Sequence, residues 1–203
     1  MPMTEWKSRP GETPLNDISG LILKGDRSRK RVADAEAENI RVVLLKYLAA
    51  KPSMKLAPFD YAWALKLHKE MYGKVWRWAG SIRQEDLNIG VPHQHVEASL
   101  YQLMGNLKCW NDSGMDIHEQ AVRPHHEAVR IHPFKDGNGR WARMLENIWL
   151  KGHGQPTTTW PEDLNETESP IRGEYIAALQ AADNGDFTPL MDLHSRHNKR
   201  GGA

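Results

Sequence analysis

The sequence predicts an all-α protein with one small β-hairpin, and three observations carry this prediction. First, apolar residues recur at three- and four-residue spacing, the period of an amphipathic helix, in a series of segments along the chain. Second, residues 81–91 lack this period and show short alternations around Asn88, Ile89 and Gly90, which is typical of a hairpin. Third, 203 residues with 39% hydrophobic content suit a single core. The predicted helical segments are residues 32–50, 58–71, 96–112, 117–130, 140–150, 170–183 and 187–197.

The chain is expected to consist of an arm, a helix and a core domain. Residues 1–31 contain several prolines and glycines and the basic cluster KGDRSRKR without clear periodicity, so we expect an extended N-terminal arm. Residues 32–52 form the N-terminal helix, which Pro52 ends. Residues 53–197 form the core domain. The polar tail, residues 198–203, is expected to be disordered.

The N-terminal helix combines one apolar stripe with an acidic first half. Asp34, Glu36 and Glu38 lie in that half, where negative charge is favourable because the helix dipole is positive at this end. The stripe is expected to pack on the core domain. Its members are Ala33, Ala37, Ile40, Val43, Leu44, Tyr47 and Leu48.

Four histidines fall within the fifteen residues from position 118 to position 132. They are His118, His125, His126 and His132, and the group raises the question of a metal site. Adjacent histidines on a helix point about 100° apart, so His125 and His126 do not readily share one ion. The sequence also lacks an HExxH motif and a cysteine pair. Core or capping roles are therefore predicted for these histidines.

A glycine-rich turn opens the next predicted helix. Gly137, Asn138 and Gly139 directly precede the periodic segment RWARMLENIWL. Glycines allow close approach of a ligand, and the free N–H groups of a first helical turn favour an anion, so the turn is a candidate phosphate site. Arg140 and Arg143, three residues apart, would add planar donors for phosphate oxygens on one helical face.

Two side chains just before this turn complete a candidate catalytic centre. Asp136 offers a carboxylate where bound phosphates would bridge to Mg²⁺. His132 precedes Pro133, and its imidazole could take a proton from a hydroxyl at physiological pH. Phe134 is the apolar residue of the loop and is expected to anchor it to the core.

The charge and cysteine content argue for a cytoplasmic protein without direct nucleic acid or membrane binding. Lys and Arg number 27 against 26 for Asp and Glu, so the formal net charge is +1. No apolar run approaches the roughly 20 residues of a transmembrane helix, and the start MPMTEWKSRP lacks a signal peptide's apolar core. Cys109 is the single cysteine, which excludes an internal disulfide.

The run HPFKDGNGRWAR is similar, at every defined position, to the motif His-Pro-Phe-x-Asp/Glu-Gly-Asn-Gly-Arg-x-x-Arg of Fic domain proteins. The resemblance implies a mainly helical fold, with residues 53–197 as the catalytic core, and transfer of AMP from ATP to a Tyr, Ser or Thr hydroxyl of a target protein. By position, His132 resembles the family's general base and Asp136 its Mg²⁺ ligand. The resemblance further implies an anion hole at residues 137–139 and contacts of both motif arginines with the outer phosphates of ATP.

The resemblance also implies two accessory features. Many Fic proteins carry an inhibitory helix with the pattern Ser/Thr-x-x-x-Glu-Gly/Asn, whose glutamate pairs with the second motif arginine. Glu38 and Asn39 match the last two letters, but Asp34 stands where Ser or Thr is expected, and Glu36 is the other candidate. A flap hairpin that docks the target by strand pairing would correspond to Asn88, Ile89 and Gly90.

The segments TPLNDISGLI and NIGVP further resemble the Fic proteins called mobile mystery protein B. This resemblance implies a toxin-like or mobile-element protein and, as a further partner, an antitoxin. Other functions remain open from the residues alone. One is a nucleotide-binding regulatory module without turnover, and another is an enzyme that removes AMP or uses another phosphate-containing donor. A metal hydrolase built on the histidine cluster is the least favoured.

Overall fold

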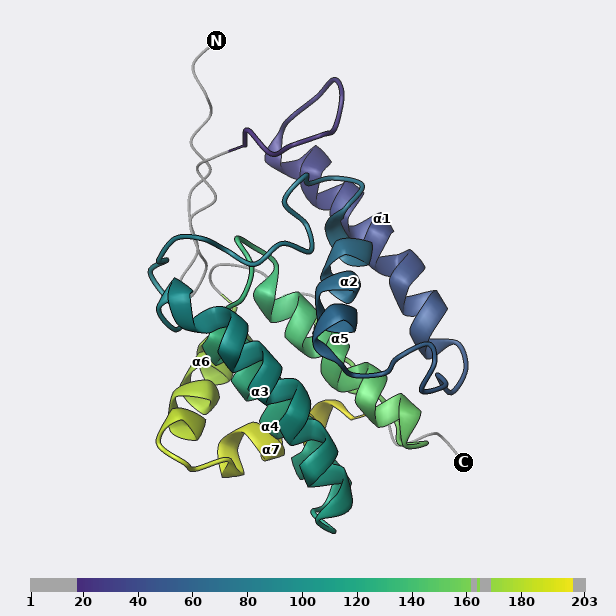
Figure 1. Ribbon diagram of the computed structural model, residues 1–203, viewed down its shortest axis with the longest axis vertical. Coiled ribbons are helices and arrows are strands. Elements are labelled where there is room, and N and C mark those ends of the chain that lie inside the picture. The colour runs from purple at the N-terminus through teal and green to yellow at the C-terminus, as the bar shows by residue number, and fades with distance from the viewer. Residues whose placement is uncertain (1–17, 162–163, 165–168, 199–203) are drawn as a thin grey trace.

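The computed structural model describes residues 18–161, 164 and 169–198, and these residues form a helical fold (Figure 1). The helices are α1 (Arg29–Leu48), α2 (Tyr61–Tyr72), α3 (His93–Asp112), α4 (Ile117–Ile131), α5 (Asn138–Gly152), α6 (Pro170–Asp183) and α7 (Thr188–His197). The described residues contain no sheet, only isolated antiparallel bridges between Leu21 and Trp76 and between Thr158 and Asn198. The predicted mainly helical fold is therefore confirmed.

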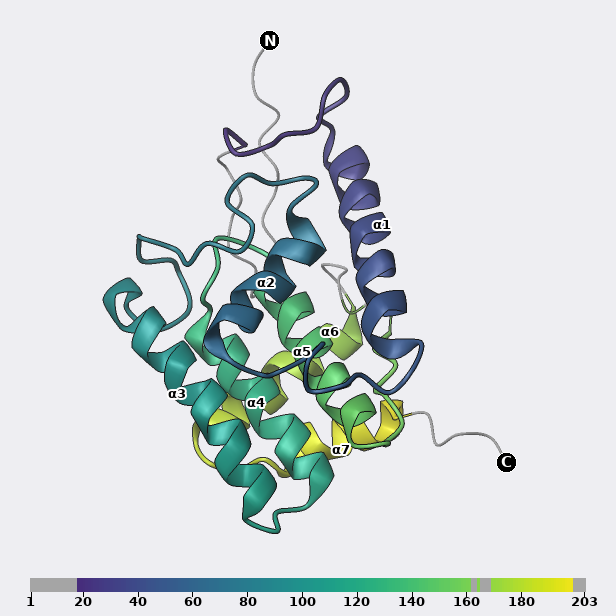
Figure 2. The same ribbon diagram turned by 45° about the vertical axis from the view of Figure 1, so that its right-hand side comes forward.

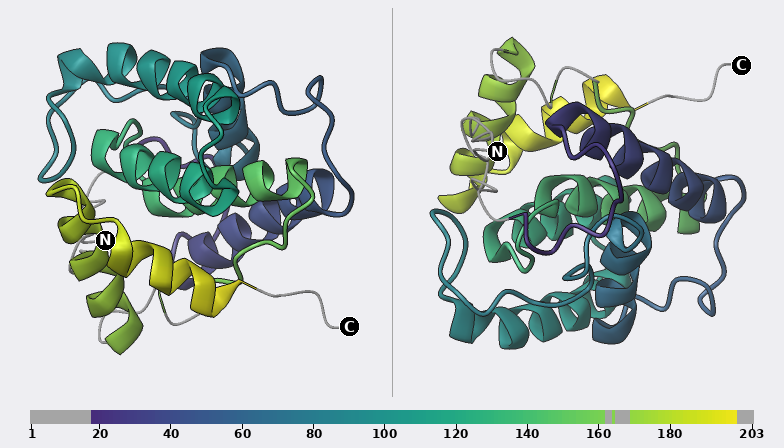
Figure 3. Two further views of the ribbon diagram at one scale, coloured as in Figure 1. Left: turned by 90° about the horizontal axis from the view of Figure 1, so that it is seen from below. Right: turned by 90° about the horizontal axis from the view of Figure 1, so that it is seen from above.

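Helix α5 lies at the centre of the molecule. All its residues from Trp141 to Leu150 are buried, because neighbouring helices pack against it on several sides. Helix α4 packs along α5 and is covered on its outer side by α3, whereas α1 and α2 contact α5 from another side. Figures 2 and 3 show the α4 and α5 pair between α3 and α1. Helices α6 and α7 pack on each other, and α7 also contacts α4.

Side-chain caps set the starts of several helices. The Asp60 carboxylate accepts a hydrogen bond from the Trp63 backbone N–H at 2.7 Å, and the Asp116 carboxylate accepts one from the His118 N–H at 2.9 Å. Ser28 caps α1 in the same way, so this helix begins at Arg29, before the predicted start. Helix α3 begins at His93, also earlier than predicted, because its polar first residues carry no apolar period.

The buried face of α1 differs in part from the predicted apolar stripe. The buried residues of this helix are Val32, Glu36, Asn39, Val43 and Tyr47. Two of them are polar, whereas Leu44, predicted to be buried, is 38% exposed. The stripe is shifted because the buried Glu36 has partners in the core, which are described below.

The predicted β-hairpin at residues 81–91 is wrong, since these residues form an irregular loop without strand pairing. The physical reason is the side chain of Arg83, which is buried inside the loop. Its guanidinium donates to the carbonyl oxygens of Glu85 at 2.9 Å and of Val91. A side chain therefore satisfies carbonyls that would otherwise pair across a hairpin.

The described end of the N-terminal arm packs against the core. Leu21 is buried, the Ile22 N–H donates to the Val75 carbonyl at 2.9 Å, and the Arg77 N–H donates to the Gly20 carbonyl at 2.8 Å. Residues 1–17 of the predicted arm and residues 199–203 of the predicted tail lie outside the described residues. Among the helices that the structure describes, none has the length and apolar character needed to cross a membrane.

Candidate active site

The loop between α4 and α5 begins at His132, whose backbone is left-handed. His132 has φ 53° and is the C-cap of α4, where its N–H donates to the Ala128 carbonyl at 3.2 Å. Such a φ is strained for a residue other than glycine, so neighbouring contacts must stabilise it.

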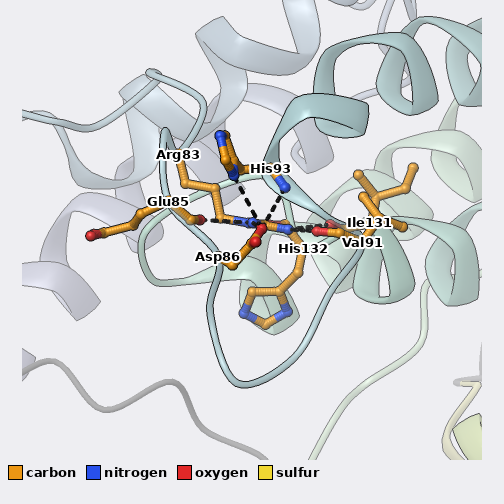
Figure 4. A network of polar contacts seen from close by, with 7 residues as sticks. All are labelled: Arg83, Glu85, Asp86, Val91, His93, Ile131 and His132. Carbon is orange, nitrogen blue, oxygen red and sulfur yellow. Dashed lines mark hydrogen bonds and ion pairs between the residues drawn. The ribbon is translucent and has the colours of Figure 1, made fainter.

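Arg83 supplies these contacts, as Figure 4 shows. Its Nε donates to the His132 carbonyl at 2.7 Å, and its NH2 donates to the Ile131 carbonyl at 3.4 Å. The Arg83 N–H also donates to the Pro133 carbonyl at 2.9 Å. Because the same guanidinium bonds the carbonyls of Glu85 and Val91, Arg83 connects the 81–91 loop to the backbone of His132.

Close packing holds the 81–91 loop next to His132. Gly90 has φ +103°, and a Cβ on Gly90 would lie 2.7 Å from the His132 Cβ and 2.9 Å from the Arg83 NH2. Only glycine fits here without displacing these neighbours. The predicted flap residues Ile89 and Gly90 thus lie beside His132, although they form no strand.

Burial sets the charge state of the His132 imidazole. The residue is 6% exposed. Burial lowers the pKa of His132 from its ordinary value of 6.5 to about 4, opposed by a backbone hydrogen bond involving Val129 and reinforced by the charge of Arg83. The ring is therefore neutral near pH 7, the state in which a histidine can accept a proton.

Hydrogen bonds within the loop and contacts with α2 fix the glycine-rich turn. The Asn138 side chain accepts from the Phe134 N–H at 2.8 Å and donates to the Phe134 carbonyl at 2.9 Å. Phe134 is fully buried and stacks on His68, with ring centroids 3.7 Å apart. The predicted anchoring role of Phe134 agrees with this geometry.

His68 and Tyr72 of α2 contact the glycine-rich turn, a role that no sequence pattern indicated. The Gly80 N–H donates to His68 Nδ1 at 3.0 Å, so Nε2 carries the proton and donates to the Asp136 carbonyl, also at 3.0 Å. Burial lowers the pKa of His68 to about 3, which keeps this tautomer neutral. The Tyr72 ring packs closely against Gly137, which has φ +81°. A Cβ on Gly137 would lie only 2.6 Å from the nearest ring atom.

Most of the predicted site residues line one cleft of about 1280 Å³. His132 and Asp136 lie at this cleft, together with residues of α1 and of the 81–91 loop. Its far wall comes from the C-terminal part of the chain. The predicted residues that line it are Glu36, Ile89, Gly90, His132, Asp136, Gly137, Asn138, Gly139, Arg140 and Arg143; those of the far wall include Thr158, Trp160, Tyr175 and Asp183. Asn88 and Glu38 are not among the lining residues.

Arg140 is paired with Glu36 across the cleft. Its NH1 lies 2.6 Å from Glu36 Oε2, and the Trp76 indole N–H donates to Glu36 Oε1 at 2.6 Å. Its NH2 lies 3.7 Å from an Asp136 oxygen. Burial alone would lower the pKa of the Arg140 guanidinium. The nearby Tyr72, Glu36 and Asp136 have the larger, opposite effect and raise this pKa above its ordinary value. The first motif arginine is thus fully charged and held by acidic groups of the protein.

The two predicted inhibitory glutamates differ sharply in position. Glu36 is 5% exposed and reaches Arg140. Glu38 is exposed, and its carboxylate accepts hydrogen bonds from Arg41 at 2.8 and 3.0 Å. Glu36 contacts the first motif arginine, whereas the resemblance implied the second, Arg143.

Arg143 lies deeper in the cleft wall, next to two aromatic rings. Its guanidinium carbon is 5.8 Å from the Trp160 ring centroid and 5.9 Å from that of Tyr175. The face of an aromatic ring attracts a cation, so these rings help to orient the guanidinium. Trp160 and Tyr175 follow the motif in the sequence, and no pattern linked them to it.

The neighbouring histidines of α4 diverge, as the helix geometry predicts. His126 Nε2 lies 2.8 Å from the Asp183 carboxylate, whereas His125 contacts Tyr175 and His194. Both are buried core residues, in agreement with the prediction. The sequence did not indicate that His125 would meet a second histidine from α7.

Comparisons with known proteins identify relatives of this chain. Residues 58–150 match the Fic/DOC family. The "Protein adenylyltransferase fic-1" of Caenorhabditis briggsae is 31% identical over 93% of this chain, and the match covers 36% of that protein's length. The chain thus spans about a third of this curated relative.

Two solved structures share the fold. "Fic-1 (aa134 - 508) from C. elegans" superposes with a TM-score of 0.67 at 26% identity, covering 89% of this chain and 52% of that one. The BepC protein of Bartonella tribocorum, solved with bound AMPPNP, superposes with a TM-score of 0.63 at 19% identity, covering 89% of this chain and 94% of that one.

Proposed function

Because this chain carries a domain of the Fic/DOC family, we propose that it is a protein adenylyltransferase, which transfers AMP from ATP to a Tyr, Ser or Thr hydroxyl of a target protein. One observation carries the proposal above the others. The candidate base His132, the carboxylate Asp136, the glycine-rich turn and both motif arginines line the same cleft. Relatives named protein adenylyltransferase support the same activity.

His132 acts as the general base in the proposed reaction. Its neutral imidazole takes the proton of the target hydroxyl, and the hydroxyl oxygen then bonds to the α-phosphorus of ATP. The bond from this phosphorus to the oxygen that bridges to the β-phosphate breaks, and diphosphate leaves with the bonding electron pair. Positioning and charge neutralisation supply most of the acceleration in such phosphate chemistry.

The glycine-rich turn and the motif arginines bind the phosphates. Gly137 is the N-cap of α5, so the free N–H groups of the first helical turn lie beside the cleft. Arg140 and Arg143 add charge for the outer phosphates. Asp136 fits a Mg²⁺ ligand, because its carboxylate lies at the cleft directly before the turn. When bound, Mg²⁺ neutralises phosphate charge.

Glu36 is the proposed inhibitory residue. While it holds Arg140, this arginine is not available to a phosphate, so ATP binds without its full set of charge contacts. Glu38, paired with Arg41 on the surface, has no such role in this proposal. The target backbone docks along Asn88, Ile89 and Gly90, as an extended segment beside His132.

The partners follow from this activity and from the resemblance to mobile mystery protein B. The essential partner is a protein with an acceptor hydroxyl, and an antitoxin would be a second one in a toxin or mobile-element setting. The proposed location is the cytoplasm. The net charge of +1 gives no reason to add nucleic acid or a membrane surface.

Transfer of label from α-³²P-ATP with Mg²⁺ into the chain itself and into a cell lysate tests the activity. The wild type is compared with His132→Ala and with the matched pair Glu36→Gln and Glu38→Gln. Label that disappears with His132→Ala and increases with Glu36→Gln supports both the enzyme and its inhibitory residue. ATP binding without label in every variant would instead favour a regulatory module without turnover. Label from another donor but not from ATP would redirect the assignment to that donor.

A further inference from the structure

A cluster of three buried, metal-ligating side chains lies outside the proposed reaction. It joins His125 of α4, Glu146 of α5 and His194 of α7, which are 0%, 0% and 5% exposed. One ligand atom from each residue lies within 4.8 Å of those of the other two. None of the three lines the active-site cleft, so AMP transfer gives no reason for their arrangement.

The spacing of the candidate ligand atoms suits a small divalent ion. His125 Nδ1 is 3.0 Å from His194 Nε2 and 3.2 Å from Glu146 Oε2. Ligand atoms about 2.0–2.2 Å from a tetrahedral zinc ion are separated from one another by roughly 3.3–3.5 Å. Small shifts of the side chains would therefore bring these atoms to bonding distance.

Two residues outside the cluster contact the other polar atoms of its members. His125 Nε2 is 2.9 Å from the Tyr175 hydroxyl, and the Thr158 hydroxyl donates to Glu146 Oε1 at 2.5 Å. Such outer contacts orient histidine and carboxylate ligands. A further contact, 2.9 Å between His194 Nδ1 and Glu146 Oε1, joins two of the proposed ligands to each other.

Glu146 carries a buried carboxylate that offers an oxygen to a cation. Its Oε2 lies 3.2 Å from His125 Nδ1, within ion-pair distance, although it makes no well-formed hydrogen bond within the described residues. Burying a carboxylate is costly, and a cation bound at this oxygen would offset that cost further than the imidazole alone. The oxygen is the same one that the ligand geometry assigns to the ion.

We propose that His125, Glu146 and His194 bind one zinc-class divalent cation. Two imidazoles and one carboxylate suit Zn²⁺ better than Mg²⁺ or Ca²⁺, which prefer oxygen ligands only. The ion has a structural role because the cleft, and with it the substrate, does not reach the three ligands. It ties α7 to the helix that carries Arg143, three residues before Glu146. This inference does not rest on the adenylyltransferase assignment.

Metal analysis of the full chain, purified without a histidine tag, tests the proposal. We expect about one equivalent of zinc per chain, and about one equivalent of Co²⁺ after chelation and reloading, with the intense visible absorption of a tetrahedral cobalt site. Stripping the metal should lower Tm by about 10 °C, and zinc should restore it. His194→Gln should abolish binding, whereas His126→Gln should retain it, because His126 is adjacent in sequence but bonds Asp183.

Two results would overturn the proposal. One is a wild-type chain that holds less than about a tenth of an equivalent of zinc after dialysis against it and gives no cobalt absorption. The cluster would then be a metal-free network of imidazoles and carboxylate. The other is full metal content in His194→Gln. The wild-type cobalt spectrum needs no variant, so the test holds even if His194→Gln does not fold.

Discussion

Glu36 and Arg140 form an ion pair, with 2.6 Å between Oε2 and NH1, that joins α1 to the first turn of α5. The side chain of Glu36 is 7% exposed and that of Arg140 is 31% exposed, so water screens the pair only in part. The Trp76 indole holds the other carboxylate oxygen and fixes the direction of the pair. Through this contact, a helix outside the matched family region pairs with a residue of the proposed phosphate site.

Replacing Glu36 by Gln is expected to raise AMP transfer about 10- to 100-fold, which corresponds to a coupling free energy of about 1–3 kcal/mol. Gln removes the negative charge yet can still accept the Trp76 N–H bond, so the helix should remain in place. The initial rate of label transfer measures the effect. Glu38→Gln is the control and should leave the rate unchanged, since the Glu38 carboxylate is exposed and pairs with Arg41 on the surface of the helix. Equal rates for Glu36→Gln and the wild type would contradict an inhibitory role.

The pH profile of transfer should be flat from about pH 6 to pH 8. A general base works in its deprotonated form, and the lowered pKa of His132, about 4, keeps that form populated until the pH falls towards 4. Activity should thus be lost at acid pH and not on the alkaline side. kcat/KM measured against pH at saturating Mg²⁺ checks this. The prediction is contradicted if kcat/KM shows an inflection near the ordinary histidine pKa of 6.5 while ATP binding over the same pH range does not. Burial would then not control the pKa of His132.

Arg83→Lys is expected to lower the free energy of unfolding by about 2–4 kcal/mol, because several buried carbonyls lose their donor. A lysine ammonium cannot reproduce the planar guanidinium that reaches both His132 and the 81–91 loop. The nucleotide Kd should change little, while kcat falls, since Arg83 holds the backbone of the proposed base His132. Urea unfolding and steady-state kinetics measure the two effects. Gln84→Lys, at the exposed neighbouring position, should stay within about 0.5 kcal/mol of the wild type.

The two glycines of the turn should respond differently to alanine. Gly137→Ala places a methyl group 2.6 Å from the Tyr72 ring at a φ of +81°, so a loss of about 2–4 kcal/mol of stability is expected. Gly139→Ala meets only Arg143 NH1 at 3.6 Å, an ordinary contact, and should fold normally. Its methyl group would still lie at the cleft and should weaken ATP binding. Thermal unfolding with and without ATP separates these effects, and equal destabilisation by both variants would contradict the packing argument.

The sequence predicted the helices and the motif loop well because both depend on local signals. Periodicity and capping residues are read from neighbouring positions, so α4 and α5 were found with nearly their observed bounds. The hairpin prediction failed since it weighed local alternation and could not foresee that the Arg83 side chain would take the loop carbonyls. The same guanidinium also bonds the carbonyls of Ile131 and His132 at the end of α4, which is far along the chain.

The choice between the two glutamates shows the same limit. Motif letters favoured Glu38, yet helical phase places Glu36 one turn after Val32, one turn before Asn39 and two turns before Val43, all buried. This phase was readable from the sequence, but an acidic residue on a buried face looks unfavourable until its partners are known. Trp76 and Arg140 are such partners, and they come from two other segments.

The two hydrogen bonds between the Asn138 side chain and the Phe134 backbone have a thermodynamic consequence for the nucleotide. They close the loop on itself without any ligand, so the backbone entropy of ordering it is lost when the protein folds and not when ATP arrives. Binding to a preformed cradle should therefore show only a small conformational contribution to its entropy and heat capacity. In the proposed enzyme, control of the site would then depend on which group pairs with Arg140, and not on whether the loop is ordered.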